Sequence, residues 1–312
     1  MAGSRRSSIL MPTLPSYVLI TPVRNEEAFI EMTIKSMIAQ TVKPLKWVIV
    51  SDGSTDGTDR IVQSYLTASP WIEFVRMPER RERHFAGKVK AFEAGYARLK
   101  DEHYEVIGSL DGDTSFDSEY FSFLLQKLAT DSSLGLVGTP FIEENRQYDY
   151  RFTSIEHVSG ICQVFRRECF EQIGGYVAIR GGGIDLVAVL TARMKGWKTR
   201  TFAEKVVQHH RPIGTAGTSL LSAWFKYGVK DYALGCHPLW QAFRTCYQMS
   251  KKPYIVGGLL LSIGYTWSSL RGAERSIPEE VIAFRRQEQM QRLRRFLSRR
   301  NLPARSELKV SS

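Results

Sequence analysis

Hydrophobic residues follow two alternating patterns over the first part of the chain. Short apolar runs, such as Tyr17–Ile20, Trp47–Val50 and Val106–Leu110, are rich in β-branched residues and predict buried strands. Between these runs, apolar residues recur every three or four positions, as they do from Ile30 to Ile38, which predicts helices that bury one face. Strands alternating with helices predict an α/β fold with a doubly wound, mostly parallel sheet. Ligand sites in such sheets form at the carboxyl edge.

The predicted strand at Val106–Leu110 ends in two acids separated by one glycine. Because side chains alternate along an extended chain, we expect Asp111 and Asp113 to point the same way, with Gly112 leaving room for a ligand. Neighbouring carboxylates suit Mg²⁺ or Mn²⁺, and such an ion could also bridge to the phosphates of a substrate. The alternative is a solvated turn that happens to carry two acids.

Two common nucleotide-binding motifs are absent from the sequence. No G-x-G-x-x-G follows the first predicted strand, and no G-x-x-x-x-G-K-S/T occurs anywhere in the chain. Without these glycine-rich phosphate cradles, the dinucleotide-binding and P-loop classes are disfavoured. The α/β pattern therefore needs a nucleotide site of another kind.

Three segments together resemble the successive motifs of family 2 glycosyltransferases. They are residues 21–26 (TPVRNE), residues 48–58 (VIVSDGSTDGT) and residues 111–113 (DGD), in that order. The resemblance covers roughly Tyr17 to His210. It implies a GT-A fold, in which a nucleotide-binding half with a D-x-D metal motif joins an acceptor-binding half.

The resemblance also implies which residues bind the nucleotide-sugar donor. The residues expected to hold the nucleoside are Thr21, Pro22, Arg24, Glu26 and Asp52. Asp52 would accept a hydrogen bond from a base N–H, although it could instead cap its own loop. Lys88 lies where the family often carries a Gly-Lys pair at the start of a helix, so we expect it to bind the diphosphate. Asp111 is expected to bind both the donor and the metal.

Upstream, Arg80, Arg81, Arg83 and His84 form either a phosphate-facing loop or a solvated charge run.

Asp185 occupies the position of the catalytic base in the family. It follows three glycines, residues 181–183, and precedes a segment with helical spacing. The family usually has Glu-Asp here, whereas Ile184 replaces the Glu in this chain, so we expect a different acceptor pocket. The alternative is that Asp185 is the N-cap of the helix, and the two roles can coexist.

A late pair of histidines supplies a candidate third metal ligand. GT-A enzymes often complete the metal site with a histidine from this part of the chain, which here carries His209 and His210. Adjacent residues on a strand point apart, so at most one of the two should bind metal. The sequence does not choose between them, and a packed or solvent-facing histidine is an equal alternative.

The last third of the chain differs in character. Residues 254–270 carry no charge and are bracketed by Lys251, Lys252 and Arg271. Spanning a bilayer takes about 20 apolar residues, so we expect an interfacial or re-entrant segment rather than a crossing, with a buried core helix as the alternative. Residues 282–297 then alternate apolar side chains with arginines, a pattern typical of a helix on an anionic lipid surface.

Composition and charge agree with a globular protein that has a basic end. The 312 residues are 43% hydrophobic, and residues 271–312 hold eleven Lys or Arg against five acids, a net +6 of the chain's +11. The four cysteines show no paired spacing, which favours a reduced, cytoplasmic protein, and Pro12 and Pro15 interrupt any N-terminal signal sequence. We predict a flexible tail (1–15), a GT-A domain (16–215) and an aromatic-rich helical, membrane-associating extension (216–312).

These observations predict an inverting, metal-dependent glycosyltransferase of polysaccharide biosynthesis. It would move one sugar from a UDP- or GDP-type donor to a lipid-linked or glycan acceptor at the cytoplasmic face of the cell membrane, as a peripheral or monotopic protein. The Gln/Arg-x-x-Arg-Trp motif of the processive synthases is absent, which favours transfer of a single sugar. One alternative is a non-catalytic membrane or nucleic-acid adaptor, but no nucleic-acid-reading module is present and we expect no nucleic-acid partner. Another is a sugar nucleotidyltransferase, which would release pyrophosphate.

Overall fold

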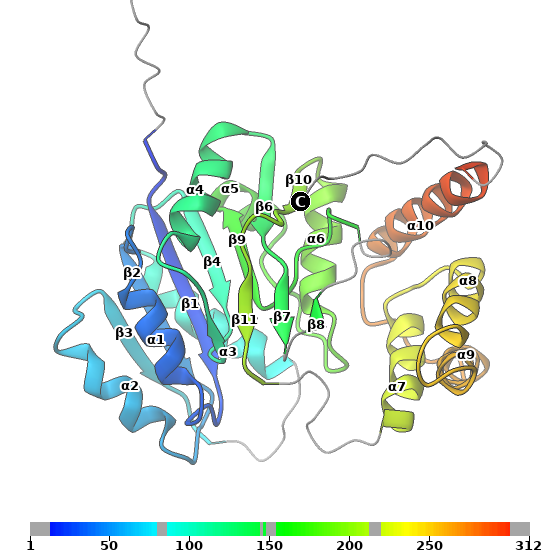
Figure 1. Ribbon diagram of the computed structural model, residues 1–312, viewed down its shortest axis with the longest axis horizontal. Coiled ribbons are helices and arrows are strands. Elements are labelled where there is room, and N and C mark those ends of the chain that lie inside the picture. The colour runs from blue at the N-terminus through cyan, green and yellow to red at the C-terminus, as the bar shows by residue number, and fades with distance from the viewer. Residues whose placement is uncertain (1–12, 80–85, 144–145, 148–153, 212–219, 300–312) are drawn as a thin grey trace, which may run out of the picture. The chain divides into compact units, whose positions relative to one another are not determined.

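The computed structural model describes residues 13–79, 86–143, 146–147, 154–211 and 220–299. Contacts divide the chain into two compact units, Met1–Thr215 and Ala216–Ser312, each of which is described by itself. The first unit is a mixed α/β structure and the second is helical (Figure 1).

The elements of the first unit alternate much as the hydrophobic pattern predicts. The strands are Tyr17–Val23 (β1), Lys46–Ser51 (β2), Ile72–Arg76 (β3), Val106–Leu110 (β4), Thr114–Ser115 (β5), Leu134–Gly138 (β6), Phe141–Glu143 (β7), Arg146–Gln147 (β8), Cys162–Arg166 (β9), Lys198–Thr201 (β10) and Val207–His209 (β11). The helices are Ile30–Ile38 (α1), Thr58–Leu66 (α2), Ala86–Tyr96 (α3), Tyr120–Thr130 (α4), Arg167–Gln172 (α5) and Ile184–Met194 (α6), with a 3₁₀ turn at Ala97–Leu99.

A large sheet and a small sheet organise this unit. The large sheet has the strand order β10-β6-β9-β4-β1-β2-β3. All neighbouring strands in it are parallel except β9, which runs antiparallel to both β4 and β6. The small sheet has the order β5-β11-β7-β8. The prediction of a mostly parallel sheet is confirmed, and β1, β2 and β4 deliver the loops that follow them to one edge.

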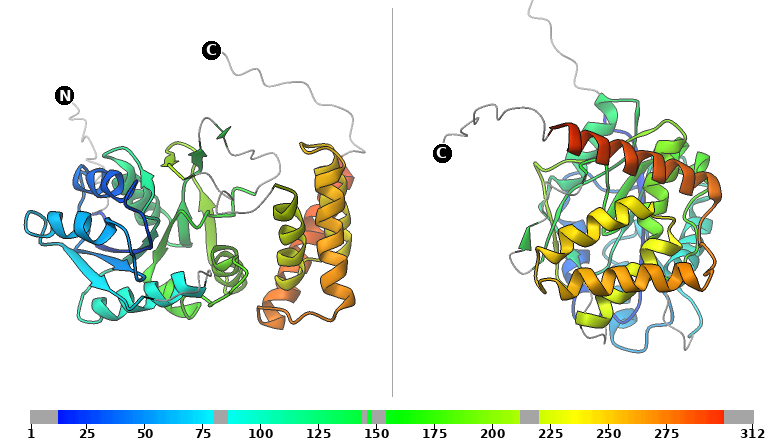
Figure 2. Two further views of the ribbon diagram at one scale, coloured as in Figure 1. Left: turned by 90° about the horizontal axis from the view of Figure 1, so that it is seen from below. Right: turned by 90° about the vertical axis from the view of Figure 1, so that its right-hand side faces the viewer.

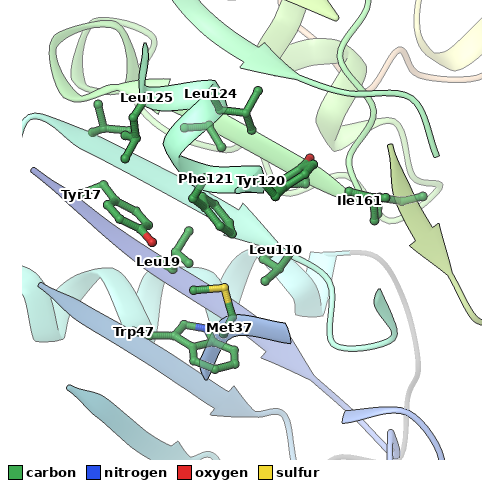
Figure 3. Packing of buried hydrophobic residues seen from close by; sticks show 14 of the residues in the cluster. Tyr17, Leu19, Met37, Trp47, Leu110, Tyr120, Phe121, Leu124, Leu125 and Ile161 are labelled. Atoms are coloured by element: carbon green, nitrogen blue, oxygen red, sulfur yellow. The ribbon is translucent and has the colours of Figure 1, made fainter. Parts of the chain in front are cut away.

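Alternating residues of the central strands build a separate core on each face of the large sheet. Tyr17 and Leu19 of β1 pack with α1 and α4, whereas Val18 and Ile20 pack on the other face with α3 and α6. Figure 3 shows the first of these cores, in which the fully buried Trp47 lies beside Met37. Both faces are therefore covered by helices, as in other doubly wound sheets.

Thr21 belongs to this core rather than to the site edge. It is fully buried, and its hydroxyl oxygen accepts a hydrogen bond from the indole N–H of Trp47 at 2.8 Å. A buried indole N–H needs an acceptor, and Thr21 provides it. The Thr21 side chain therefore stabilises the core, and a role of Thr21 in holding the nucleoside stays a prediction.

The loop after β1 is held to the loop after β2. Asn25 lies before α1, which begins at Ile30, and has a left-handed φ of 56°. Its side-chain oxygen accepts a hydrogen bond from the Thr55 N–H at 2.9 Å. The Asp56 carboxylate accepts from the Thr58 N–H at 3.0 Å, as expected for a loop cap. The loops after β1 and β2 are thus tied together.

The second unit packs helices at close range (Figure 2). Its helices are Leu220–Ala233 (α7), Pro238–Met249 (α8), Val256–Leu270 (α9) and Glu279–Arg299 (α10). A Cβ placed on Gly264 of α9 would lie 2.1 Å from the Phe225 carbonyl oxygen of α7, and one on Gly228 would lie 2.1 Å from that of Leu261. The backbones of α7 and α9 are therefore in direct contact. Among the described residues, no helix combines the length and the hydrophobicity that a membrane crossing requires.

Part of α10 faces the interior of this unit. Arg285 is buried and donates to the Leu234 carbonyl, and Arg286 donates to the Gly235 carbonyl at 3.1 Å. These carbonyls follow the end of α7, where the last backbone acceptors have no helical partner. The expectation that both arginines lie on a lipid-facing surface is wrong, because they cap α7 instead.

Candidate functional site

The two acids that follow β4 face different basic side chains. Asp111 pairs with the ammonium of Lys88, which lies in the first turn of α3 and also donates to the Gly160 carbonyl at 3.4 Å. Asp113 is 7% exposed and faces β11. Gly112 leaves no room for a ligand, because a Cβ there would lie 2.6 Å from Cγ1 of Val23. The two carboxylates therefore come close to each other, but each has its own cationic partner.

His209 is the histidine that faces this pair of acids. Its Nε2 lies 3.4 Å from Oδ1 of Asp113, and its Nδ1 lies 2.7 Å from Oε1 of Glu143 on β7. The ring of His210 lies 2.8 Å from the Ser115 hydroxyl and stacks on Phe29, so it points the other way. The expectation that the side chains of adjacent histidines diverge is confirmed. The ring of His209, not that of His210, faces the Asp113 carboxylate.

The electrostatics of the two acids differ. Burial raises the pKa of Asp111 above its ordinary value, although Lys88 opposes this. Burial also acts to raise the pKa of Asp113, but hydrogen bonding and charge from His209, with help from Arg211, lower it overall. Burial acts to lower the pKa of Lys88 and that of His209. The pKa of Lys88 is nevertheless raised by Asp111, and the pKa of His209 is raised by Asp113. The edge thus forms a network of alternating charges.

Arg211 closes the network on its outer side. Its guanidinium pairs with the Glu26 carboxylate, and its Nε lies 3.7 Å from Oδ2 of Asp113. It also donates to the Asn25 carbonyl at 3.1 Å. The structure therefore links Glu26, predicted to hold the nucleoside, to the acids after β4.

The remaining nucleoside candidates lie at the ends of β1 and β2. Asp52 is 5% exposed, and its Oδ2 lies 3.9 Å from the Arg24 guanidinium. Pro22 is half-buried in β1 opposite Val50. Arg24 and Asp52 thus lie together, as the motif order predicts. A polar hollow of about 430 Å³ lies beyond them, lined by Ser54, Thr55, Asp56, Asp59, Arg60, Gln63, Arg76 and Glu79. None of the predicted site residues lines that hollow, so we do not place the donor there.

Two glycines set the position of Asp185. Gly182 and Gly183 have φ values of 82° and 98°, a region that favours glycine, and α6 begins directly after them. Gly183 is the N-cap residue of this helix, so the N-cap alternative for Asp185 is wrong. Asp185 lies in the first turn of α6. A Cβ placed on Gly160 would lie 2.9 Å from the Cβ of Asp185, so the two residues are neighbours. Since Lys88 donates to the Gly160 carbonyl, Asp185 lies on the Lys88 side of the edge.

Comparison with known proteins decides the family. A family model described as Glycosyl transferase family 2 matches residues 18–177, about half of the chain. The chain belongs to glycosyl transferase family 2. It is 26% identical over 157 residues to the poly-beta-1,6-N-acetyl-D-glucosamine synthase of Staphylococcus aureus (strain COL), and 27% identical over 132 residues to the uncharacterized glycosyltransferase EpsJ of Bacillus subtilis (strain 168). These matches cover 50% and 42% of this chain but only 36% of each relative.

Two solved structures share the fold. The mannosyltransferase PcManGT from Pyrobaculum calidifontis, in complex with GDP-Man and Mn²⁺, aligns with a TM-score of 0.56 and 19% identity, over 93% of this chain and 81% of that one. S. aureus TarS 1–349 in complex with UDP-GlcNAc aligns with a TM-score of 0.53 and 13% identity, over 83% and 74%. At these identities the likeness is evidence for the fold alone, and the α/β unit matches the GT-A fold of the family.

A metal site is not preformed in this arrangement. Across the described ranges, no group of three or more His, Cys, Asp or Glu side chains is positioned to hold a metal ion. Asp111, Asp113 and His209 nevertheless supply oxygen and nitrogen donors that suit Mn²⁺ or Mg²⁺. The bond from His209 Nδ1 to Glu143 fits such a role, because it leaves Nε2 directed at Asp113.

Sequence reasoning missed Glu143 and Arg211 as members of the site. Glu143 is 66 residues away from His209 in the chain and belongs to no motif, so no local signal marks it. Arg211 directly follows the histidine pair, and an arginine next to a candidate metal ligand could have been tested as a phosphate-binding residue. The predicted cluster of Arg80, Arg81, Arg83 and His84 lies outside the described residues.

Proposed function

We propose that this family 2 protein is an inverting glycosyltransferase of polysaccharide biosynthesis. It would transfer one sugar from a UDP- or GDP-type donor to a lipid-linked or glycan acceptor at the cytoplasmic face of a membrane. The observation that carries the proposal is the convergence of Lys88, Asp111, Asp113 and Asp185 at one edge of a GT-A sheet. The GDP-Man and UDP-GlcNAc complexes of the structural neighbours support a nucleotide-sugar donor.

Asp185 is the proposed base. Its carboxylate would take the proton of the acceptor hydroxyl while that oxygen attacks the anomeric carbon. The bond from this carbon to the diphosphate oxygen breaks on the opposite side, and the bonding electrons leave with the nucleoside diphosphate. Asp185 lies next to Gly160, whose carbonyl accepts a hydrogen bond from Lys88, which supports a proposed base and phosphate-binding cation on the same side of the site.

Lys88 and Arg211 would bind the negative charge of the donor. In the structure, each of these cations is paired with acids of the site, Lys88 with Asp111 and Arg211 with Glu26 and Asp113. A diphosphate offers stronger, charge-assisted acceptors than a single carboxylate does. Donor binding would therefore exchange these internal pairs for contacts with phosphate.

Asp111, Asp113 and His209 would hold a divalent cation. When bound, Mg²⁺ or Mn²⁺ stabilises the charge that develops on a departing nucleoside diphosphate. The Mn²⁺ present with GDP-Man in the PcManGT structure supports this assignment. The exchange of cationic partners described above would free Asp111 and Asp113 for this role.

A nucleotide-sugar screen tests the proposed function. The full-length protein is incubated with UDP- and GDP-sugars, with and without Mn²⁺, while thermal stability and released products are measured. We expect one donor to raise the melting temperature in a Mn²⁺-dependent way, since saturation at about 100 times Kd stabilises the folded state by about 2.7 kcal/mol. The same donor should yield nucleoside diphosphate. Release of pyrophosphate would support a nucleotidyltransferase, and no response to any donor would contradict the proposal.

Glu143 gives a sharper test of the metal assignment. Replacing Glu143 with Ala removes the partner of His209 Nδ1, so we expect Mn²⁺ affinity to fall by about 10- to 100-fold. Isothermal titration of Mn²⁺ into protein saturated with donor measures this. Glu204→Ala, which removes an exposed acid paired with Lys127, is the matched control and should leave the affinity unchanged. Equal affinity of the wild type and Glu143→Ala would exclude His209 as an oriented ligand.

A further inference from the structure

Helix α9 exposes five large apolar side chains along one side. Val256, Leu259, Ile263, Trp267 and Leu270 are between 44% and 83% exposed. They recur at steps of three and four residues, which places them along one side of the helix. We call these five residues the outer stripe of α9.

The opposite side of α9 is built mainly from small residues, with Leu261 as the large one. Its buried positions are Gly257, Gly258, Leu261, Gly264 and Ser268. Through Gly264 the helix lies against the backbone of α7, and through Gly258 it lies against α8, where a Cβ would come 2.7 Å from the Thr245 carbonyl oxygen. Helices in water usually bury their large apolar residues and expose polar ones. Small residues at helix contacts with large apolar residues outside are typical of helices in lipid.

Basic residues flank α9 at both ends, whereas the helix itself is uncharged. No acid or base occurs from Val256 to Leu270, whereas Lys251 and Lys252 precede the helix and Arg271 follows it, all three exposed. The guanidinium of Arg271 lies 3.8 Å from the ring centroid of Trp267. Aromatic and basic residues at the ends of an apolar surface suit the headgroup region of a bilayer.

We propose that the outer stripe of α9 docks on an anionic lipid surface, with the helix lying in the plane of the membrane. Its 15 residues extend about 22 Å, less than the roughly 30 Å of a bilayer's hydrocarbon core. In the plane, the stripe enters the acyl region while Lys251, Lys252 and Arg271 contact lipid phosphates.

The charges favour lipid over a second copy of the chain. A two-fold contact between outer stripes would place the basic ends of α9 near basic ends of the partner copy, whether the helices run parallel or antiparallel. Such like charges repel, whereas anionic headgroups neutralise both ends at once. The inference specifies the surface that would serve the proposed membrane location, and it does not depend on sugar transfer.

Vesicle binding by the full-length protein tests the docking surface. Co-sedimentation is measured with vesicles of phosphatidylcholine alone and with added phosphatidylglycerol. We expect binding to the anionic vesicles, and loss of affinity on the order of 10-fold or more for Ile263→Glu combined with Trp267→Glu, because both charges fall within the stripe. Ser269→Glu adds the same charge at an exposed position of α9 outside the stripe and should change binding far less.

A second variant keeps the test independent of folding. Leu270 is 83% exposed, so Leu270→Glu should leave thermal stability unchanged while it weakens vesicle binding. No binding by the wild type, or equal binding by the stripe variants and Ser269→Glu, would overturn the proposal. The proposal would also be overturned if the wild type formed a dimer in solution that the stripe variants dissociate, and did not bind vesicles. Stabilisation by nucleotide sugars should be the same in all variants, so failure here is distinguishable from failure of the proposed function.

Discussion

Asp185→Asn is expected to lower kcat by about 100-fold or more while donor affinity stays unchanged. The amide keeps the size of the carboxylate but cannot take a proton from the acceptor hydroxyl. Asp185 lies in the first turn of α6, whose N-cap is Gly183, so the substitution should not unfold the helix. Nucleoside diphosphate release measures turnover, and titration with the donor measures binding.

Glu168→Gln is the matched control for this prediction. Glu168 also lies in the first turn of a helix, α5, and it is exposed. The control should leave kcat unchanged, because the loss of a first-turn charge alone does not affect chemistry. If Asp185→Asn lowered donor affinity and kcat together, Asp185 would be a structural residue. If it left kcat unchanged, another group would be the base.

Gly264→Ala is expected to destabilise the helical unit. The added Cβ would lie 2.1 Å from the Phe225 carbonyl oxygen, and backbone cannot move aside as a flexible side chain can. Forcing α7 and α9 apart should cost about 1–3 kcal/mol by overpacking, which exceeds the gain of about 1 kcal/mol from the better helix propensity of Ala. We expect the melting temperature of this unit to fall by about 5 °C or more.

Gly257→Ala separates the packing effect from helix propensity. It lies on the same helix, but its added Cβ would meet no backbone, only the end of the Gln248 side chain at 3.3 Å and the Pro253 ring at 3.4 Å. This variant should be as stable as the wild type or more stable, as measured by thermal unfolding followed by circular dichroism. Equal melting temperatures for both glycine variants would contradict the close contact between α7 and α9.

The order of motifs along the chain was sufficient to predict the sheet and many of the charged residues at its carboxyl edge. The strands at Tyr17–Val23, Lys46–Ser51 and Val106–Leu110 follow from local runs of apolar residues. Because parallel strands end at one edge, the acids that follow β2 and β4 had to lie near each other. These features depend on residues within a few positions of each other, which is why they can be predicted without a structure.

The partners of the site side chains were decided only by tertiary structure. Arg211 contacts Glu26 across 185 residues of sequence, and no local pattern encodes that contact. The register of β11 against β5 sets His209 opposite Thr114, which turns His209 rather than His210 toward Asp113. Register depends on how two distant strands pair, so the sequence left both histidines open.

In the helical unit, too, the sequence and the tertiary structure determined different features. The uncharged stretch 254–270 already predicted an apolar segment, interfacial, re-entrant or buried, since its composition is local information. Which side of that helix faces outward depended on α7, whose Gly228 meets the backbone of Leu261 and draws the small residues of α9 inward. Composition therefore determined that the segment is apolar. Packing against a distant helix determined which of its apolar residues stay exposed, because only contact between folded segments distinguishes one face of a helix from the other.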